Sequence, residues 1–361
     1  MSKRLLCLMM VGITLLLSGC YDQIEVSDEL YAILLGVDEG TKGKVKLTLV
    51  LPVYGGSGGE EQQQPSESKL YTTEADNLYE GLNQLHLQVA RGISLLHLKL
   101  IVFLEKVARA GLHDYATEIR QHIETRNVMG VMVTDGTAEE YISYVSESST
   151  GVLSQELEQL LFRSRKNIYF PVRTFEEFCR DMESDYGQTY AVYSKSAEEA
   201  CELYGTALFQ DGTMVGVLDK YQSACTMLVR KEFDGGMMTI GDMVVDIDGD
   251  PKVKIKPEIR DGQTKIQVFL KLRGGLMEGE NPGHPVRSRD DIARGIEEYI
   301  NETVSITQQC GSDIWGFGKM AAACFSNIPP WEAYHWNRKF PMAQIQTHVE
   351  FQIVKTEVNK R

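Results

Sequence analysis

Apart from its N-terminal segment, the sequence has no long apolar run. Beyond an N-terminal segment described below, no stretch approaches the roughly twenty apolar residues that a transmembrane helix requires. The sequence is also acidic overall, with a formal net charge of -14. Because nucleic acids and anionic lipid surfaces attract clustered cations, this composition argues against both as electrostatic partners.

The motifs of common enzymes and metal sites are missing as well. No two cysteines have C-x-x-C spacing, and no two histidines have the i, i+4 spacing of a metalloprotease pair. Adjacent glutamates such as Glu139 and Glu140 point to different sides of a helix, which does not suit paired acid-base chemistry. The sequence therefore indicates no catalytic residue, no metal ligand and no cofactor.

Two weaker signals have simple structural explanations. The acidic segment 246–250 resembles the start of a calcium-binding loop, but an EF-hand needs glycine and glutamate where this chain has Pro251 and Pro257. We therefore predict an acidic hairpin turn. His97 lies in a predicted apolar strand, where an imidazole titrates near neutrality, but a hydrogen-bonded core histidine is the more ordinary interpretation.

The first twenty residues have the form of a secretory signal peptide. Lys3 and Arg4 precede the apolar stretch Leu5 to Leu17, and the segment ends in Leu-Ser-Gly-Cys at Cys20. This ending resembles the bacterial lipobox, which predicts removal of residues 1–19 and a diacylglycerol on the Cys20 thiol. Lipid chains acting together then hold the protein to a membrane. The alternatives are a plain signal with an incidental cysteine, or an uncleaved anchor.

The remaining cysteines are odd in number, and their pairing cannot be deduced from spacing. One or two disulfides are compatible with an extracytoplasmic protein, but we expect mostly buried free thiols, since cysteine is among the most often buried residues. These cysteines are Cys179, Cys201, Cys225, Cys310 and Cys324.

The first half alternates strand and helix patterns. Strands are predicted at 30–37 and 44–53, joined by a glycine turn, and again at 95–104, 128–134 and 189–193. Helical spacing of apolar residues occurs at 75–90, around 112–119, and at 137–146, 153–162 and 174–182. This order predicts a mixed sheet with helices against it. The polar, glycine-rich segment 55–68 is predicted to be a flexible loop, because it lacks the lysine and helix of a phosphate-binding loop.

The second half is rich in hairpin signals. Strands at 203–209 and 214–218 flank an Asp-Gly turn, a helix covers 219–229, and strands at 237–247, 252–259 and 264–272 suggest an antiparallel meander. A long helix is predicted at 289–309, a helical stretch at 318–340 broken at Pro329-Pro330, and a final strand at 343–358. The predicted fold is multidomain α+β with mixed and antiparallel sheets flanked by helices. We place an N-terminal α+β region at 20–197, as one unit or two subdomains, and a C-terminal α+β domain at 198–361.

One unusual segment enters the predicted helix near residue 318. It reads Asp313-Ile314-Trp315-Gly316-Phe317-Gly318. Glycine loses the most backbone entropy on folding, so ordering these glycines costs free energy. Their position beside aromatic residues at a helix start therefore suggests a fixed turn that packed rings stabilise. The segment is either a corner of the core, which we favour, or a patch that faces a partner.

Several segments in order resemble the Ger(x)C lipoproteins, the C subunits of bacterial spore germinant receptors. Cys20-Tyr21-Asp22-Gln23-Ile24-Glu25 is similar to the family's Cys-Trp-Asp-x-x-Glu-Ile, and Leu35-Gly36-Val37-Asp38 to its Leu-Gly-Ile-Asp. Residues 204–209 with Val215-Gly216 resemble its Gly-x-Ala-x-Phe hairpin, and residues 313–318 its Asp-x-Phe-Gly-Phe-Gly, followed by an aromatic segment with Trp331, Trp336 and Phe340. Tyr21 stands where tryptophan is usual and Trp315 where phenylalanine is usual.

The resemblance implies a non-enzymatic subunit held by lipid on the outer face of the inner spore membrane. It also implies A-type and B-type integral membrane subunits as partners in a complex that detects nutrients. It makes the following residues candidates for family motifs or partner contacts: Asp22, Glu25, Asp313, Trp315, Gly316, Phe317 and Gly318. A lipid-anchored solute-binding protein is the main alternative, although such proteins have two similar α/β lobes, and a cell-envelope hydrolase is a third class.

Overall fold

The structure is a computed structural model that describes residues 29–53, 67–122, 125–126, 128–161, 169, 172–197, 200–232, 235–241, 243–277 and 289–356. The predicted lipid attachment residue Cys20, the motif residues Asp22 and Glu25, and most of the predicted loop at 55–68 lie outside these ranges. Among the described helices, none combines the length and the apolar character needed to cross a bilayer.

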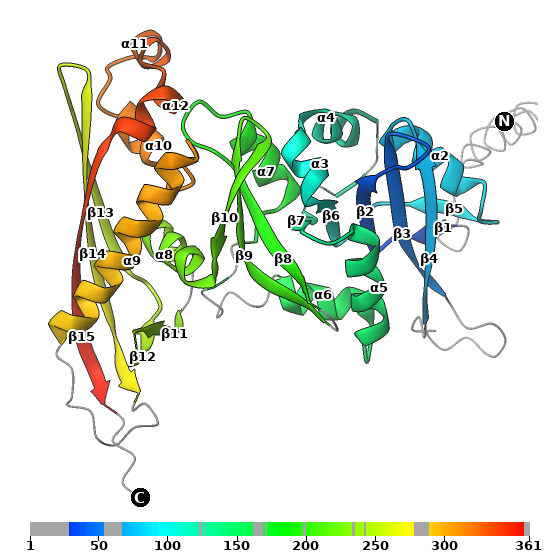
Figure 1. Ribbon diagram of the computed structural model, residues 1–361, viewed down its shortest axis with the longest axis horizontal. Coiled ribbons are helices and arrows are strands. Elements are labelled where there is room, and N and C mark those ends of the chain that lie inside the picture. The colour runs from blue at the N-terminus through cyan, green and yellow to red at the C-terminus, as the bar shows by residue number, and fades with distance from the viewer. Residues whose placement is uncertain are drawn as a thin grey trace, which may run out of the picture.

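A mixed eight-stranded sheet forms one end of the elongated molecule and reaches its middle (Figure 1). Strands β2, β6, β7 and β8 run parallel to one another, whereas β3, β4, β9 and β10 pair antiparallel at the two flanks. In spatial order the strands are β10 (Thr213–Asp219), β9 (Ala200–Gln210), β8 (Tyr190–Ala197), β7 (Gly130–Thr134), β6 (Leu100–Leu104), β2 (Leu34–Glu39), β3 (Val45–Val53) and β4 (Glu67–Ala75). A small parallel pair, β1 (Glu29–Tyr31) and β5 (Gly92–Ser94), lies beside it.

Helices cover both faces of this sheet, which confirms the predicted mixed sheet with flanking helices. One face packs against α2 (Leu78–His86), α3 (Glu105–Ala110), α4 (His113–His122) and α7 (Phe175–Met182). The other packs against α5 (Ala138–Ser148) and α6 (Leu153–Leu161). The central strands are therefore buried on both sides, as their continuous apolar sequences require.

The Leu35–Asp38 motif joins β2 to α5. Thr137 caps α5 through a capping box with Glu140. The buried Asp38 carboxylate also accepts hydrogen bonds from Ala138 N (2.6 Å) and Glu139 N (3.0 Å) at the same helix start. Any side chain at Gly36 would meet the Ile142 methyl at 2.8 Å. The glycine and the aspartate of this motif therefore let the helix approach the strand closely.

The hairpin β9–β10 turns at Asp211-Gly212, where both residues have positive φ angles of 48° and 78°. These angles are those of the two-residue turn that the Asp-Gly pair predicts. Upstream, β8 and β9 pair antiparallel on either side of residues 198–199. The proposed boundary between the two halves of the sequence thus lies within one continuous sheet.

The C-terminal part is a second sheet with helices on one side. Its central strand β14 (Gln263–Met277) pairs with β13 (Lys252–Arg260) and β12 (Met243–Asp248) along one edge and, in parallel, with β15 (Gln344–Thr356) along the other. β12 also pairs with β11 (Gly235–Ile240). Helices α8 (Lys220–Arg230) and α9 (Arg289–Gln309) pack on the side toward the eight-stranded sheet (Figure 1). The short helices α10 (Phe317–Ala322), α11 (Ile328–Tyr334) and α12 (Trp336–Lys339) and the 3-10 turn η3 (Phe340–Met342) lead into β15.

Three strand predictions were wrong in detail. The predicted strand 95–104 is a strand only from Leu100, because Leu98 N bonds Leu95 O (3.1 Å) and closes a turn before it. The predicted strand 237–247 is the hairpin β11–β12, which reverses near Gly241 at a positive φ of 61°. No meander runs from β12 to β13, because β14 is long enough to pair with β13 over one part of its length and with β12 over the rest.

Candidate functional site

The segment Asp313–Gly318 forms a buried turn between α9 and α10. Asp313 is 2% exposed, and its carboxylate accepts hydrogen bonds from Phe317 N (3.2 Å), Gly318 N (2.7 Å) and Trp336 Nε1 (2.8 Å). Burial raises the pKa of this carboxyl above its ordinary value, while the same three hydrogen bonds and the nearby Arg230 act in the opposite direction. The carboxylate thus closes the first turn of α10 and ties it to α12.

The two glycines of the turn are required for different reasons. Gly316 has a φ of 75°, in the left-handed region, although a Cβ there would meet only Arg230 Nη1, at an ordinary contact distance of 3.8 Å. At Gly318 a Cβ would lie 2.5 Å from the Trp336 ring and from the Tyr186 carbonyl oxygen. Gly316 is therefore needed for backbone conformation, and Gly318 for space.

Aromatic rings fill the core around this turn. Trp315 stacks on Phe317 with ring centroids 5.7 Å apart, and its indole N–H donates to the Thr307 hydroxyl (2.9 Å). Trp331 stacks on Tyr186 at 5.6 Å and lies 6.1 Å from the Trp336 ring. The aromatic segment that follows the motif is buried with it, including Phe340. This is the geometry of a core corner.

The turn also joins the C-terminal part to the eight-stranded sheet. Gln188 N donates to the Asp313 carbonyl oxygen (2.9 Å), Arg230 Nη1 to the Ile314 carbonyl oxygen (2.6 Å), and the Ser312 hydroxyl to the Phe209 carbonyl oxygen (2.6 Å). These contacts come from the segment before β8, the end of α8 and the end of β9. No local pattern pointed to Gln188 or Arg230, because each reaches the turn only through folding.

A cluster of buried charged residues surrounds Arg230 and holds its guanidinium in place. Its guanidinium pairs with Glu232 (2.7 Å), which also accepts a hydrogen bond from the Tyr190 hydroxyl (2.6 Å). Arg173, 6% exposed, lies over the Tyr190 ring at 4.4 Å and pairs with Asp181 (3.2 Å). Although burial alone would raise the pKa of Glu232, the two arginines hold it below its ordinary value. The cluster therefore stays ionised and fixes the junction.

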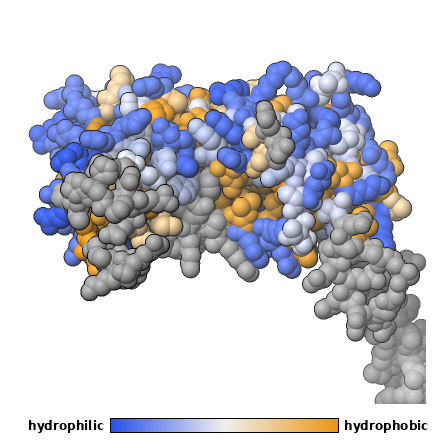
Figure 2. Space-filling view, turned by 60° about the horizontal axis from the view of Figure 1, so that its bottom comes forward, coloured by the Kyte–Doolittle hydropathy of each residue, from blue (hydrophilic) through white to orange (hydrophobic). Residues whose placement is uncertain are grey.

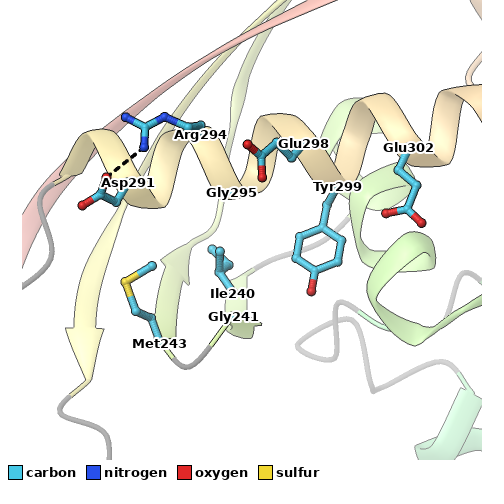
Figure 3. Close-up of a pocket in the computed structure, with 9 residues that line it drawn as sticks. All are labelled: Ile240, Gly241, Met243, Asp291, Arg294, Gly295, Glu298, Tyr299 and Glu302. Carbon is cyan, nitrogen blue, oxygen red and sulfur yellow. Dashed lines mark hydrogen bonds and ion pairs between the residues drawn. The ribbon is translucent and has the colours of Figure 1, made fainter. Parts of the chain in front are cut away.

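A cavity of about 620 Å³ lies elsewhere, between α9 and the β11–β12 turn (Figure 3). Gly295 lets α9 approach Ile240 closely. Arg294 pairs with Asp291 (3.1 Å), whereas the carboxylates of Glu298 and Glu302 extend from the same helix (Figure 3). Its lining is acidic and open, and no group of three or more potential metal ligands occurs in the part of the chain that the structure describes.

His97 lies before β6 and not within a strand. Its ring packs against Tyr31 with centroids 4.5 Å apart and lines a cavity of about 390 Å³ with Lys99 and Arg126. Burial, together with these two cations, lowers the pKa of His97. The His97 side chain is exposed, so the interpretation as a hydrogen-bonded core histidine was wrong, and the ring packs on the surface of the β1 region.

The five described cysteines are free thiols. Cys179 and Cys225 are buried, Cys201 and Cys310 half-buried, and Cys324 exposed. No disulfide therefore links the elements around the motif in the described chain.

Comparison with known proteins relates the chain to spore germination proteins. The family model for the spore germination protein N-terminal domain matches residues 22–195, and the model described as spore germination B3/GerAC like, C-terminal, matches residues 204–357. Spore germination protein GerQC of Bacillus cereus is 24% identical over 372 residues, covering 99% of this chain and 100% of that protein. Spore germination protein KC of Bacillus subtilis is 29% identical over 146 residues, covering 39% of this chain and 36% of that protein.

A solved structure has the same fold. The crystal structure of the GerBC protein matches with a TM-score of 0.57 at 17% identity, covering 89% of this chain and 97% of that chain. At this identity the match bears on the fold, and it agrees with a multidomain α+β architecture.

Proposed function

The chain belongs to the Ger(x)C family of spore germination proteins, and from that membership we propose that it is a lipid-anchored, non-enzymatic subunit of a nutrient germinant receptor. The observation that carries the proposal is the match of both family models, in order, over nearly the whole chain after the predicted signal peptide. Cys20 provides the membrane attachment, on the outer face of the inner spore membrane. A-type and B-type integral membrane subunits are the partners.

The geometry of the motif supports a structural role within this chain. Every hydrogen bond of the Asp313 carboxylate goes to a group of the fold, and its neighbours Trp315 and Phe317 are buried. The motif therefore shapes the C-terminal part and its junction with the eight-stranded sheet. In this proposal the folded part of the chain stabilises or transmits a conformation of the receptor, and the ligand-binding residues belong to other subunits.

Deletion of the gene in a spore-forming host tests the proposal. Spores that lack the protein are expected to lose germination in response to at least one nutrient, and the wild-type gene is expected to restore it. The tagged protein is expected to co-purify with membrane subunits encoded beside it. Normal germination with every nutrient, together with no co-purifying membrane subunit, would refute the proposal.

The alternative of a lipid-anchored solute-binding protein predicts a different result. Titration calorimetry of the purified chain against amino acids and sugars would then show tight binding by this protein alone. A receptor subunit that acts through assembly shows no such heat of binding.

A further inference from the structure

The outer face of the C-terminal sheet gathers positive charge on an acidic protein. Along β13, Val253, Ile255 and Ile259 pack toward the core, and the residues between them point outward. Lys254 and Lys256 are among these exposed side chains. Because side chains alternate along a strand, every second residue of β13 contributes to one solvent-facing surface.

Strand pairing extends this surface over β14 and β15. Lys256 lies beside Gln267, and Lys271 lies between Lys252 and Glu350. The cations of the face, which we call the basic face, are Lys252, Lys254, Lys256, Arg260, Lys265, Lys271 and Arg273.

Few of these charges are neutralised. Arg260 pairs with Glu258 (2.5 Å) and Lys271 with Glu350 (2.6 Å). Within the described residues the other cations have no ion pair; they are Lys252, Lys254, Lys256, Lys265 and Arg273. The formal charge of the whole chain is -14, so the basic face is rich in cations although the chain as a whole is acidic.

An aromatic residue lies at the centre of the basic face. Phe269 is only half-buried, its ring stacks on His348 with centroids 5.1 Å apart, and the Lys256 ammonium lies 4.8 Å from its centroid. Interfaces between proteins commonly combine a central aromatic anchor with surrounding charge. The composition of the face therefore suits a partner that is both acidic and able to cover an apolar ring.

The position of the basic face selects the kind of partner. The sheet stands at the end of the elongated body opposite to β1, with its helices on the inner side (Figure 1). Hydrophilic residues prevail at that end in a second view, whereas hydrophobic residues gather nearer the middle (Figure 2). If Cys20 tethers the chain, the short segment before Glu29 holds the β1 end near the membrane, so the basic face points away from the anchoring bilayer.

We propose that the basic face docks on an acidic surface of another protein of the receptor complex, with Phe269 as the central apolar contact. This inference rests on the proposed function. Opposite charges across such an interface speed association and orient the partner, and their contribution weakens as salt rises.

Chemical crosslinking of the intact complex tests the docking. The full chain is purified with its membrane subunits and treated with a carbodiimide, which joins a lysine ammonium directly to a carboxylate. Crosslinks are expected from Lys254, Lys256 or Lys265 to aspartate or glutamate of another polypeptide, and they are expected to weaken several-fold at about 0.5 M salt. An intact complex whose crosslinks avoid these lysines would overturn the proposal.

A charge-reversal pair gives a second measurement. The variant K254E/K256E is expected to co-purify with the membrane subunits about tenfold less than wild type, which corresponds to about 1.4 kcal/mol. The matched control K44E/K69E changes net charge equally at two exposed residues, Lys44 just before β3 and Lys69 in β4, and it is expected to bind as wild type does. Circular dichroism checks that both variants fold.

The outcomes separate the two proposals. If wild type fails to co-purify with any membrane subunit, the proposed function falls and the docking falls with it. If wild type and K254E/K256E co-purify equally, only the docking falls. If the purified chain binds phosphatidylglycerol vesicles through Lys254 and Lys256, the face is a lipid-binding surface and the protein-docking proposal is wrong.

Discussion

The indole N–H of Trp336 donates a hydrogen bond of 2.8 Å to the Asp313 carboxylate, across 23 positions of sequence. Both residues are nearly inaccessible to solvent, at 2% exposure each. The same carboxylate closes the start of α10, so one buried group fixes two helices and the turn between α9 and α10. A buried carboxylate with several donors is strongly stabilising only while all its partners remain.

Substitution of Asp313 is expected to destabilise the protein strongly. Asp313→Ala leaves two backbone N–H groups and the Trp336 indole without an acceptor, so we expect a loss of about 3 kcal/mol in the free energy of unfolding. Trp336→Phe removes one donor and keeps most of the ring, and a loss of about 1 kcal/mol is expected. Denaturant unfolding measures both, and an Asp313→Ala variant as stable as Trp336→Phe would contradict the three-donor arrangement.

The two glycines of the turn are expected to respond unequally. Gly318→Ala places a methyl group against the Trp336 ring and the Tyr186 carbonyl, which we expect to cost about 3 kcal/mol. Gly316→Ala meets no close neighbour and incurs only the left-handed backbone cost of about 1 kcal/mol. Gly262→Ala is the control, because Gly262 has a φ of 76° and a methyl group there would have no atom within 4 Å. Equal losses for all three variants would mean that space around Gly318 is unimportant.

Acid is expected to weaken the β2–β3 turn through Glu74. Its carboxylate accepts hydrogen bonds from Lys42 N, the Thr41 hydroxyl and Gly43 N, which lower its pKa from 4.5 to about 2. The unfolded chain therefore binds a proton on Glu74 at a higher pH than the folded chain. Stability from this group is present above about pH 4.5 and is lost as the pH falls toward 2.

The variant Glu74→Gln isolates this contribution. Its unfolding free energy is expected to fall less steeply than that of wild type between about pH 5 and pH 3. Denaturant melts across this range measure the difference. Parallel curves for the two proteins would show that Glu74 does not titrate differently on folding.

The thiols are expected to differ in reactivity by position. Burial raises the pKa of Cys179 to about 12, and Cys225 is 0% exposed, whereas Cys324 is exposed. Iodoacetamide near pH 8 is expected to label Cys324 rapidly in the native protein and the two buried thiols only after unfolding. Peptide mass mapping reads each site, and equal native labelling of Cys179 and Cys324 would contradict the packing described.

Removal of the predicted lipid attachment is expected to change the location of the protein. Cys20→Ala prevents acylation, so the chain should leave the membrane fraction in a strain that lacks the partner subunits. Wild type in the same strain should remain in that fraction. A Cys20→Ala protein that still sediments fully with membranes would require another attachment.

Much of the secondary structure follows from local sequence. The predicted helices at 289–309 and 137–146 and the reversal at Asp211-Gly212 agree with the structure, because each depends on residues a few positions apart. Strand partners were harder to predict. The apolar pattern of 237–247 does not reveal a reversal near Gly241, and nothing local shows that β14 pairs with β12, β13 and β15 together.

For the candidate site, the sequence singled out the turn but not its surroundings. Glycines between aromatic residues marked 313–318 as fixed backbone. The contacts from Gln188 and Arg230 could not be predicted, because they arise where the end of α8 and the segment before β8 meet the turn. The pairing of β8 with β9 across the proposed domain boundary near 197 is likewise a tertiary feature that no local pattern indicates.

Local sequence was enough to predict most of the helices and strands and the α+β class, because apolar periodicity and turn residues act over short distances. The distribution of surface charge, in contrast, depends on tertiary structure. Lys252, Lys254 and Lys256 alternate with apolar residues on one strand, and Lys265 and Arg273 lie on another, so the linear chain does not show these cations as one group. Pairing of β13 with β14 brings these cations to one face, and an acidic protein thereby acquires a basic surface.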